Sequence, residues 1–426
     1  MEQFNKEIVT RDEIQAYCGT LDKSLSVGLF WAPRVGKTKA TLNLLAEGEK
    51  VLVVSNTEII REAWKKVLPD GCKSICYQSL KNEIDEYDCI VFDESDLLGE
   101  NYYEIVSNMT FKRFICLTGT ETFRSKSILA KLKKKVSGEY FEWKIGFQQA
   151  IDWKILPEPQ IICFGLNLRE SKQDQVFTIG KNKAKQVKYC KYGEHFQHLR
   201  EKKWNIAIQC SEKEWVSMIN KEIDNLNEIL TNFRNYYKAQ KSGDQFELNR
   251  LEPIVKKYPL PEATYLNFIK AKGLARKNFL ADKKNRYIKR LLKYFKVENE
   301  RVLIFANSIP QAEFIDEKCA VHSNIKLKKG EISALDKFNS GDSSTLVAVG
   351  ILDRGVSVFN VHTSFILQIP ASQASVTQKA SRNLLDDSPR LVLVYFKGTK
   401  DEENVIKFTK QFDQKYIFWK DANNEI

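Results

Sequence analysis

The first third of the chain alternates short apolar runs with amphipathic segments. The run VGLFWA has the length of a strand, and the KATLNLLAEG stretch that follows predicts a helix with Leu42 and Leu45 on one face. A later run through Ile90, Val91 and Phe92 is typical of strands that are covered on both faces. The pattern therefore favours a layered α/β arrangement.

The last third repeats this alternation. Strands are predicted for the segments RVLIFANS, TLVAVG, SFILQIP and LVLVYF. Helices are predicted for ARKNFLADKKNRYIKRLLKYF, for IPQAEFIDEKC from near Pro310, and for EISALDKFNSG up to Gly341. Because strands that alternate with helices form parallel sheets, we expect two parallel-sheet lobes in an α/β protein.

A mainly helical, basic stretch separates the two alternating regions. We place the first lobe at residues 1–150, the second at 151–166 and 265–400, the insertion at 167–264 and a C-terminal tail at 401–426. At 426 residues, 43% of them hydrophobic, the chain is long enough for more than one core.

The charge of the chain is concentrated in its middle. The formal net charge is +12, and residues 169–296 hold 29 Lys and Arg against 14 Asp and Glu. Aromatic residues stand among these bases: Tyr189, Tyr192, Trp204, Phe233, Tyr236 and Tyr237. Bases mixed with aromatic rings suit a phosphate backbone with stackable bases, so this stretch favours nucleic-acid binding. A solvated helical face is the alternative interpretation.

Residues 30 to 38 read FWAPRVGKT. A loop between a strand and a helix can point backbone N–H groups and the helix N-terminus at a triphosphate. Gly36 would let the backbone approach the phosphates, Lys37 would reach the β- and γ-phosphates, and the hydroxyl of Thr38 would coordinate Mg²⁺. The segment therefore predicts a site for a nucleoside triphosphate.

A second acidic motif lies at residues 89 to 96, which read CIVFDESD. Asp93 and Glu94 follow an apolar run, so they lie at the carboxyl end of a strand, where open α/β sheets place their ligands. Asp93 would hold Mg²⁺ directly or through water, and Glu94 would polarise the attacking water. A solvated turn is the alternative interpretation of the same letters.

The rest of the composition bears on the cellular location of the protein and on the state of its cysteines. No apolar run approaches the length of a membrane span, and the N-terminus is polar and mixed in charge, so we predict a cytoplasmic protein without a membrane partner. Nine cysteines sit mostly in apolar surroundings, as reduced core residues do. A zinc site from Cys190, His195, His198 and Cys210 is disfavoured, because the spacing matches no familiar finger.

These motifs occur in the order found in superfamily 2 helicases and translocases, and the chain resembles that family, particularly its compact phage-type members. The resemblance covers residues 10 to 165 and 265 to 397. It is carried by APRVGKT (motif I), VLVVSNTEIIREAW (Ia), YQSL (Ib), VFDESD (II), LTGT (III), VLIFANS (IV), GILDRGVSV (V) and QKASRNLL (VI). A phage-encoded protein that acts in the host cytoplasm fits this resemblance.

The resemblance implies two RecA-like lobes with ATP and Mg²⁺ between them. Gln378 and Arg382 of the second lobe would approach the γ-phosphate, with Arg382 as an arginine finger. Further nucleotide contacts are implied for Arg34 in the phosphate loop and for Gln15 on the predicted helix RDEIQAY. Contacts to a nucleic-acid backbone are implied for Asn56, Ser79, Ser308 and Arg354.

The chain departs from the family pattern at several positions. Arg34 stands where motif I usually has glycine, and Ser357 stands where motif V commonly has an acidic residue. In motif VI, Ser381 and Leu385 replace the usual glycine and a second arginine. These changes leave ATP hydrolysis as the expectation and make efficient unwinding a weaker one.

Three functional classes stay open at this point. The first is an ATP-dependent helicase or translocase on DNA, in replication or recombination and with the partner proteins of those processes. The second is an RNA-directed remodeler, which the same motor would support. The third is a nucleotide-gated nucleic-acid-binding scaffold with weak turnover.

Overall fold

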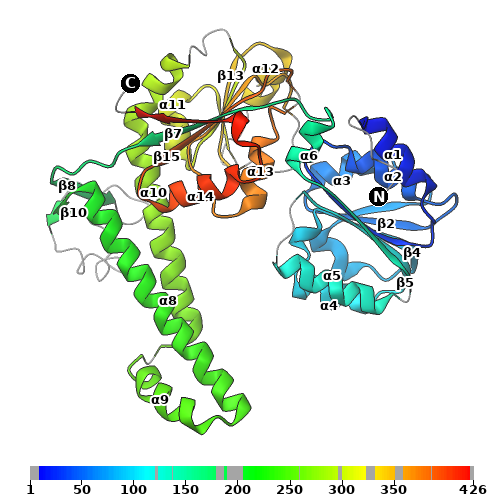
Figure 1. Cartoon of the computed structure of the whole chain (residues 1–426), viewed down its shortest axis with the longest axis horizontal. Helices are drawn as coiled ribbons and strands as arrows, with labels where there is room; N and C mark the ends of the chain where they lie inside the picture. The colour runs from blue at the N-terminus through cyan, green and yellow to red at the C-terminus, as the bar shows by residue number, and fades with distance from the viewer. Residues whose placement is uncertain are drawn as a thin grey trace. The chain divides into compact units, whose positions relative to one another are not determined.

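The computed structural model describes residues 9–119, 123–136, 138–178, 187–189, 205–258, 260–295, 300–322, 332–350, 358–384 and 386–422. The chain divides into two compact units. Unit 1 comprises Met1–Gly165, Asn285–Tyr395 and Lys400–Ile426, and unit 2 comprises Leu166–Lys284 and Phe396–Thr399. Unit 1 contains two large sheets, which we call lobe 1 and lobe 2 together with their helices (Figure 1).

Lobe 1 is a six-stranded sheet in the order β3-β2-β4-β5-β1-β6. Its pairings are all parallel. The strands are β1 (Ser26–Trp31), β2 (Val51–Ser55), β3 (Lys73–Cys76), β4 (Tyr87–Asp93), β5 (Phe111–Leu117) and β6 (Tyr140–Ile145). The helices are α1 (Arg11–Thr20), α2 (Lys37–Leu44), α3 (Glu58–Lys65), α4 (Glu100–Ser107), α5 (Phe123–Lys135) and α6 (Phe147–Asp152).

Strands β1 and β2 of lobe 1 are buried on both faces, as their apolar sequences predict, whereas β3 and β6 have exposed positions. All residues of β1 and β2 are buried. Two separate hydrophobic clusters lie on this sheet, one including Val51, Val53 and Val91 and the other Leu52, Val54 and Ile90. Successive residues of one strand therefore belong to opposite faces, because side chains alternate along a strand.

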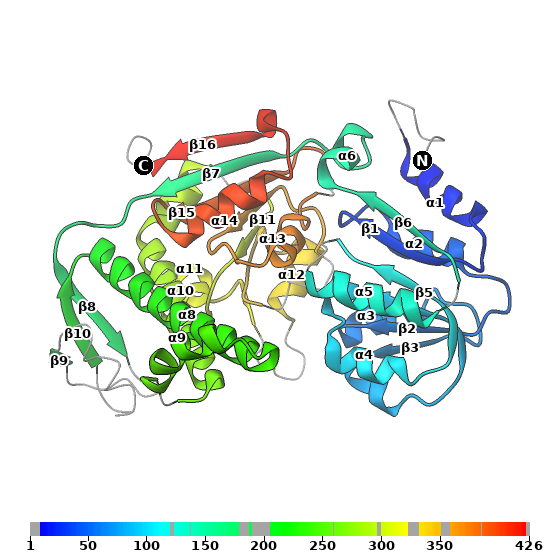
Figure 2. The same cartoon turned by 60° about the horizontal axis from the view of Figure 1, so that its bottom comes forward.

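Lobe 2 is a seven-stranded sheet in the order β12-β13-β11-β14-β15-β7-β16. The strands are β7 (Gln160–Leu166), β11 (Val302–Phe305), β12 (Ala320–Val321), β13 (Thr345–Ala348), β14 (Thr363–Ile366), β15 (Arg390–Phe396) and β16 (Ile417–Asp421). The helices are α11 (Ile309–Asp316), α12 (Ala334–Ser340), α13 (Gln373–Ala380) and α14 (Lys400–Thr409). Strands β7 and β16, far apart in the sequence, lie side by side in a parallel pair (Figure 2).

Unit 2 combines long helices with a small sheet. The sheet has the order β8-β10-β9, with β8 (Gln173–Thr178), β9 (Val187–Tyr189) and β10 (Asn205–Cys210). The helices are α8 (Glu212–Ser242), α9 (Gln245–Lys256) and α10 (Glu262–Tyr294), the last of which continues into unit 1. Helices α8 and α10 run antiparallel, joined by ion pairs from Lys272 to Glu222 and from Arg234 to Glu262 (Figure 1).

The predicted fold class, α/β with two parallel-sheet lobes, is confirmed. The predicted strands and helices of both alternating regions are also observed, and α12 ends at Gly341, which has φ +92°. Leu42 and Leu45 are both half-buried against the same hydrophobic cluster, and Leu44 of α2 is fully buried in it. The stretch predicted as a tail contains α14 and β16, and β16 belongs to the lobe 2 sheet.

Candidate nucleotide site

The phosphate loop connects β1 to α2. Gly36 immediately precedes α2 with φ +104°, a left-handed conformation that favours glycine. A Cβ atom on Gly36 would lie only 2.0 Å from Nε2 of Gln15, so a side chain at this position would displace Gln15 from the loop. The helix N-terminus after Gly36 offers backbone N–H groups of the kind that bind phosphate. The backbone therefore has the conformation that the motif predicts.

Arg34 adopts a conformation that is uncommon for a residue with a side chain. Its φ is +71°, in the left-handed region, where a non-glycine residue is disfavoured. Burial lowers the pKa of the guanidinium, and the charge of Arg11 lowers it further. Within the described residues, one terminal nitrogen of Arg34 is buried and has no hydrogen-bond partner. A strained residue with an unsatisfied buried donor points to a ligand-binding role.

Lys37 begins α2 and lies close to the acidic motif. Its Nζ donates a hydrogen bond to the backbone oxygen of Trp31 at 2.9 Å. Burial lowers the pKa of Lys37, and the opposing effect of the nearby Glu94 and Asp93 carboxylates raises it. Thr38, the next residue, is exposed at the same helix end. The amino group and the carboxylates, distant in sequence, are thus electrostatically coupled.

Asp93 ends β4 and is held by two hydrogen bonds. The indole Nε1 of Trp64 donates to Oδ2 at 2.8 Å, and the backbone N–H of Glu94 donates to Oδ1 at 3.0 Å. Burial, and secondly the charge of Glu94, raise the pKa of Asp93 to about 6. The hydroxyl of Tyr77 donates to the backbone oxygen of Asp93 at 3.3 Å. The carboxylate is therefore oriented as well as desolvated.

Glu94 follows in a left-handed conformation, with φ +55°. Its Oε2 accepts a hydrogen bond from Nε2 of Gln378 at 3.3 Å, so a residue of motif VI meets one of motif II within unit 1. Two residues further on, Asp96 accepts a hydrogen bond from the hydroxyl of Thr118 at 3.1 Å. Motifs II, III and VI thus share direct contacts.

Gln15 of α1 lies over the phosphate loop. The side chain is buried, and its Nε2 donates to the backbone oxygen of Gly36 at 3.4 Å. Within the described residues, Oε1 of Gln15 is buried and has no hydrogen-bond partner. A buried acceptor beside the loop fits a donor group on a bound nucleotide.

Three residues that hold this site were not singled out from the sequence. Trp64 orients Asp93, Thr118 contacts Asp96, and Tyr77 supports the backbone at Asp93. Tyr77 and Thr118 belong to the segments resembling motifs Ib and III. Trp64 lies on the α3 face that packs on the core, so its apolar surroundings concealed its polar contact.

The remaining predicted residues are more dispersed. The hydroxyl of Ser308 caps α11 by accepting a hydrogen bond from the backbone N–H of Gln311. Asn56 is half-buried after β2, and Ser79 is exposed. Arg382 lies just beyond α13, where its backbone N–H donates to Lys379. Arg354 lies outside the described residues. The predicted nucleic-acid contacts therefore stay predictions.

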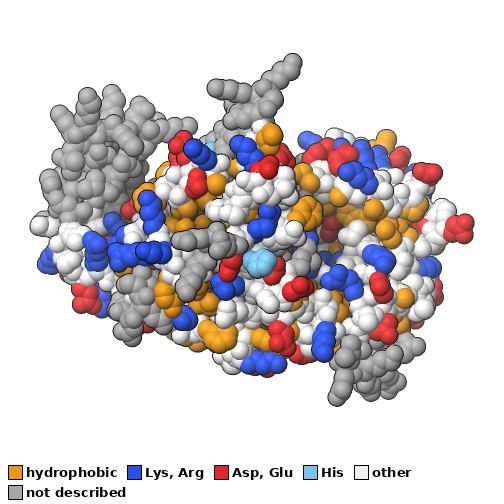
Figure 3. All heavy atoms as spheres, turned by 90° about the horizontal axis from the view of Figure 1, so that it is seen from above, with side chains coloured by type: hydrophobic (Ala, Val, Ile, Leu, Met, Phe, Trp, Pro, Cys, Tyr) orange, Lys and Arg blue, Asp and Glu red, His pale blue; other side chains and the backbone are white. Residues whose placement is uncertain are grey.

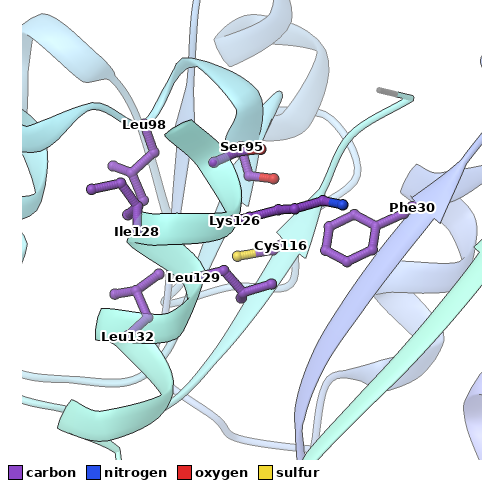
Figure 4. Close-up of a pocket in the computed structure, with 9 residues that line it drawn as sticks. Phe30, Ser95, Leu98, Cys116, Lys126, Ile128, Leu129 and Leu132 are labelled. Atoms are coloured by element: carbon purple, nitrogen blue, oxygen red, sulfur yellow. The ribbon is translucent and has the colours of Figure 1, made fainter. Parts of the chain in front are cut away.

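A small pocket lies beside the acidic motif in lobe 1 (Figure 4). Leucine and isoleucine side chains of α5 face Cys116 of β5, with Ser95 and Phe30 at the other sides. Burial raises the pKa of Cys116 to about 12, so its thiol stays protonated at neutral pH. The pocket is thus a mainly apolar packing feature, and Cys116 is not an activated nucleophile in it.

The donor set fits Mg²⁺. Hydroxyl and carboxylate oxygens, as on Thr38 and Asp93, are its preferred protein ligands, and magnesium usually keeps several waters and substrate oxygens. No cluster of three or more His, Cys, Asp or Glu in the described parts of the chain could hold a metal ion. An Mg²⁺ ion held chiefly by phosphate oxygens needs no such cluster. Of the disfavoured zinc set, only Cys210 is among the described residues.

Within the described residues the cysteines are free thiols, and Cys18, Cys89 and Cys163 are buried. No helix among the described residues is long and apolar enough to cross a membrane.

Comparison with known proteins gives one family match. Residues 283–384 match the model of the helicase conserved C-terminal domain, a span that includes Gln378 and Arg382. The match confirms the predicted resemblance to superfamily 2 helicases for the second lobe; the phage-type assignment stays a prediction. Among solved structures, the chain is similar to the helicase domain of Hef from Pyrococcus furiosus, with 15% identity, a TM-score of 0.42, and coverage of 93% of this chain and 97% of that chain. No curated protein matches the chain.

Proposed function

We propose that this chain, whose second lobe carries the helicase conserved C-terminal domain, is a nucleic-acid-dependent ATPase that works as a helicase or translocase. The observation that carries the proposal is the grouping of Lys37, Asp93 and Glu94 beside a glycine that begins a helix. A buried amino group next to two carboxylates at a helix N-terminus suits a triphosphate with its magnesium ion.

Each residue has a separate task in this proposal. Lys37 leaves the backbone oxygen of Trp31 and binds the β- and γ-phosphates, while Thr38 and Asp93 hold Mg²⁺. Bound Mg²⁺ supplies neutralisation of the charge on the phosphate oxygens. Glu94 orients the attacking water, with Gln378 fixing the Glu94 carboxylate through their hydrogen bond. Arg34 and Gln15 contact the nucleotide through their unsatisfied buried atoms.

The second lobe contributes the remaining catalytic charge. We assign Arg382 as the arginine finger, because it follows Gln378 by four residues on the segment that reaches Glu94. In the transition state negative charge spreads over the γ-phosphoryl oxygens, and an arginine there lowers the barrier. We also propose the domain boundaries predicted from the sequence, in which the insertion at 167–264 separates the two segments of the second lobe.

The nucleic acid is assigned as DNA, with replication or recombination as the setting and the cytoplasm as the location. Basic residues of the insertion support a polyanionic partner. Among the described side chains on the face seen in Figure 3, acidic and basic groups are intermingled. Asn56, Ser79, Ser308 and Arg354 are the proposed backbone contacts of the motor. An RNA-directed remodeler and a nucleotide-gated scaffold are the competing functions.

One experiment separates the three classes. ATP hydrolysis is measured with no nucleic acid, single-stranded DNA, duplex DNA, a DNA fork and RNA of the same sequence. Stimulation by DNA that exceeds stimulation by RNA supports the DNA motor, and the reverse order supports the RNA remodeler. Binding of ATP and nucleic acid without turnover on any substrate identifies a scaffold. Absence of ATP binding contradicts the proposal.

A further inference from the structure

A second pocket lies within unit 2, away from the residues assigned to ATP. It has a volume of about 760 Å³. Its walls come from the chain after β7, from the first turns of α8, and from the turn after β15. The backbone N–H of Lys397 donates to the oxygen of Leu166 at 2.9 Å, which ties the third segment to the first. The pocket is thus assembled from three distant parts of the sequence.

The polar groups in this pocket are mainly hydrogen-bond donors. Lys213 and Lys397 supply two ammonium groups from different elements, and Ser217 supplies a hydroxyl. Asn167 and Asn220 add amide groups, and Oδ1 of Asn220 accepts a hydrogen bond from Arg276. With Oδ1 engaged in this way, the Nδ2 group of Asn220 is the part of the amide that can donate to a ligand. Ammonium, amide and hydroxyl donors from separate segments suit a phosphate group.

One acidic residue also lines the pocket. Glu170 pairs with Lys213 at 2.8 Å, and both side chains are largely exposed. An exposed ion pair contributes little to stability, so a ligand phosphate can compete for Lys213 at small cost. The Glu170 carboxylate should repel an anionic ligand. Removing its charge should therefore strengthen binding, whereas removing a lysine should weaken it.

The surrounding charge favours a polymer over a small anion. Helix α10, which supplies Arg276, contains ten Lys and Arg against two Asp and Glu. A single nucleotide cannot neutralise a basic helix of this length, whereas a nucleic-acid backbone presents phosphates at regular intervals.

We propose that this pocket binds a backbone phosphate of nucleic acid through Lys397 and Lys213, with Asn220 and Ser217 as hydrogen-bond donors. The inference rests on the proposed function, because the ligand of the pocket is the nucleic acid on which the proposed ATPase acts. It adds a contact outside the motor motifs, where the chain that enters the insertion after β7 lies beside the turn after β15.

The test measures the affinity of the full chain for a fluorescent single-stranded DNA at several salt concentrations. Lys397→Gln should weaken binding about tenfold, since it removes one charged hydrogen bond. It should also reduce the slope of log affinity against log salt by about 0.7, the value for one phosphate contact on a single strand. Glu170→Gln should strengthen binding.

Lys221→Gln is the matched control, because Lys221 is exposed on α8 but does not line the pocket. Its salt slope should stay closer to that of the wild type than the Lys397→Gln slope. Basal ATP hydrolysis and thermal midpoint should be unchanged in all three variants, which shows that they fold.

If the wild type binds DNA and the salt slopes of Lys397→Gln and Lys221→Gln are equal, the pocket assignment is overturned. The proposed function then still stands. Failure of the wild type to bind any nucleic acid would overturn both. A change in the number of ATP molecules bound by Lys397→Gln, with DNA binding unaltered, would identify free nucleotide as the phosphate source and overturn the nucleic-acid assignment.

Discussion

Trp64 and Asp93 are joined by a hydrogen bond from the indole Nε1 to Oδ2, at 2.8 Å. The bond links a helix on the sheet to the carboxylate that is proposed to hold Mg²⁺. It favours the charged form of Asp93, whereas burial and the charge of Glu94 raise the pKa of that carboxyl to about 6. The indole therefore limits the effect of desolvation on this site.

Replacing Trp64 with Phe should shift the acid limb of the ATPase pH profile upward. Asp93 binds Mg²⁺ only when deprotonated, so activity should fall as the pH drops through its pKa. Loss of a hydrogen bond to a charged group costs about 1.5 kcal/mol, which raises the pKa by about one unit. Rates measured between pH 5 and 8 check this. An unshifted acid limb in a folded Trp64→Phe variant would show that Asp93 does not control activity.

Changes at Lys37 and Glu94 should separate binding from turnover. Lys37→Ala removes the proposed phosphate cation and should weaken nucleotide use, whereas Glu94→Gln should keep ATP binding and slow hydrolysis. The two variants are compared by titration with ATP and by single-turnover hydrolysis. Hydrolysis at the wild-type rate by Glu94→Gln would remove Glu94 from its proposed role.

Replacing Arg34 with Gly tests whether the departure from the family pattern serves nucleotide binding. Glycine relieves a left-handed conformation that costs about 1 kcal/mol, so the thermal midpoint should stay equal or rise. If the guanidinium contacts the nucleotide, ATP affinity should nevertheless fall about tenfold. Lys39→Gln is the control, since Lys39 forms an exposed pair with Asp12. Equal or tighter binding by Arg34→Gly would assign Arg34 no contact with the nucleotide.

Arg382→Ala should lower turnover far more than ATP affinity. An arginine finger acts mainly on transition-state charge, and such residues account for about 10³- to 10⁵-fold in rate. ATP affinity and single-turnover rate are measured on the same preparation. Unchanged turnover would move the assignment to Lys379, because Arg390 is already paired with Glu300 at 3.1 Å.

Arg113 and Glu49 form a buried ion pair whose disruption should destabilise lobe 1. Two guanidinium nitrogens of Arg113 lie 2.7 Å from the two carboxylate oxygens, and both side chains are under a tenth exposed. Arg113→Leu leaves Glu49 unpaired and should cost about 3 to 5 kcal/mol in the free energy of unfolding. Lys112→Gln, which breaks an exposed pair with Asp88, should cost less than about 1 kcal/mol. Urea denaturation gives the free energy of unfolding of both variants. Similar losses for Arg113→Leu and Lys112→Gln would contradict the expected difference.

The fold was predictable because several strands of each large sheet, such as β2 and β11, are mostly apolar runs. Such runs reveal strands and their order along the chain, and Gly36 and Gly341 mark helix ends through positive φ. The pairing of β7 with β16 was not predictable, since a short strand near the C-terminus carries exposed Phe418 and Trp419 and lacks the buried pattern.

The site was predictable where chemistry and local sequence coincide. Lys37, Asp93 and Glu94 follow from two short motifs, and the structure brings their charges together. The partners of these residues depend on three-dimensional packing. Trp64 reaches Asp93 from another element, and Gln378 reaches Glu94 across most of the sequence. A pattern in one segment cannot reveal such contacts.

The position of β7 between β15 and β16 sets an order for folding during synthesis. All strands of lobe 1 lie before residue 146, so that sheet can form while the rest of the chain is still being made. Strand β7 follows almost at once, but both of its neighbours come after residue 389. Until they emerge, β7 exposes apolar residues and two open edges, which promote aggregation. A chain shortened to end before β16 would leave the edge of β7 that pairs with β16 permanently open.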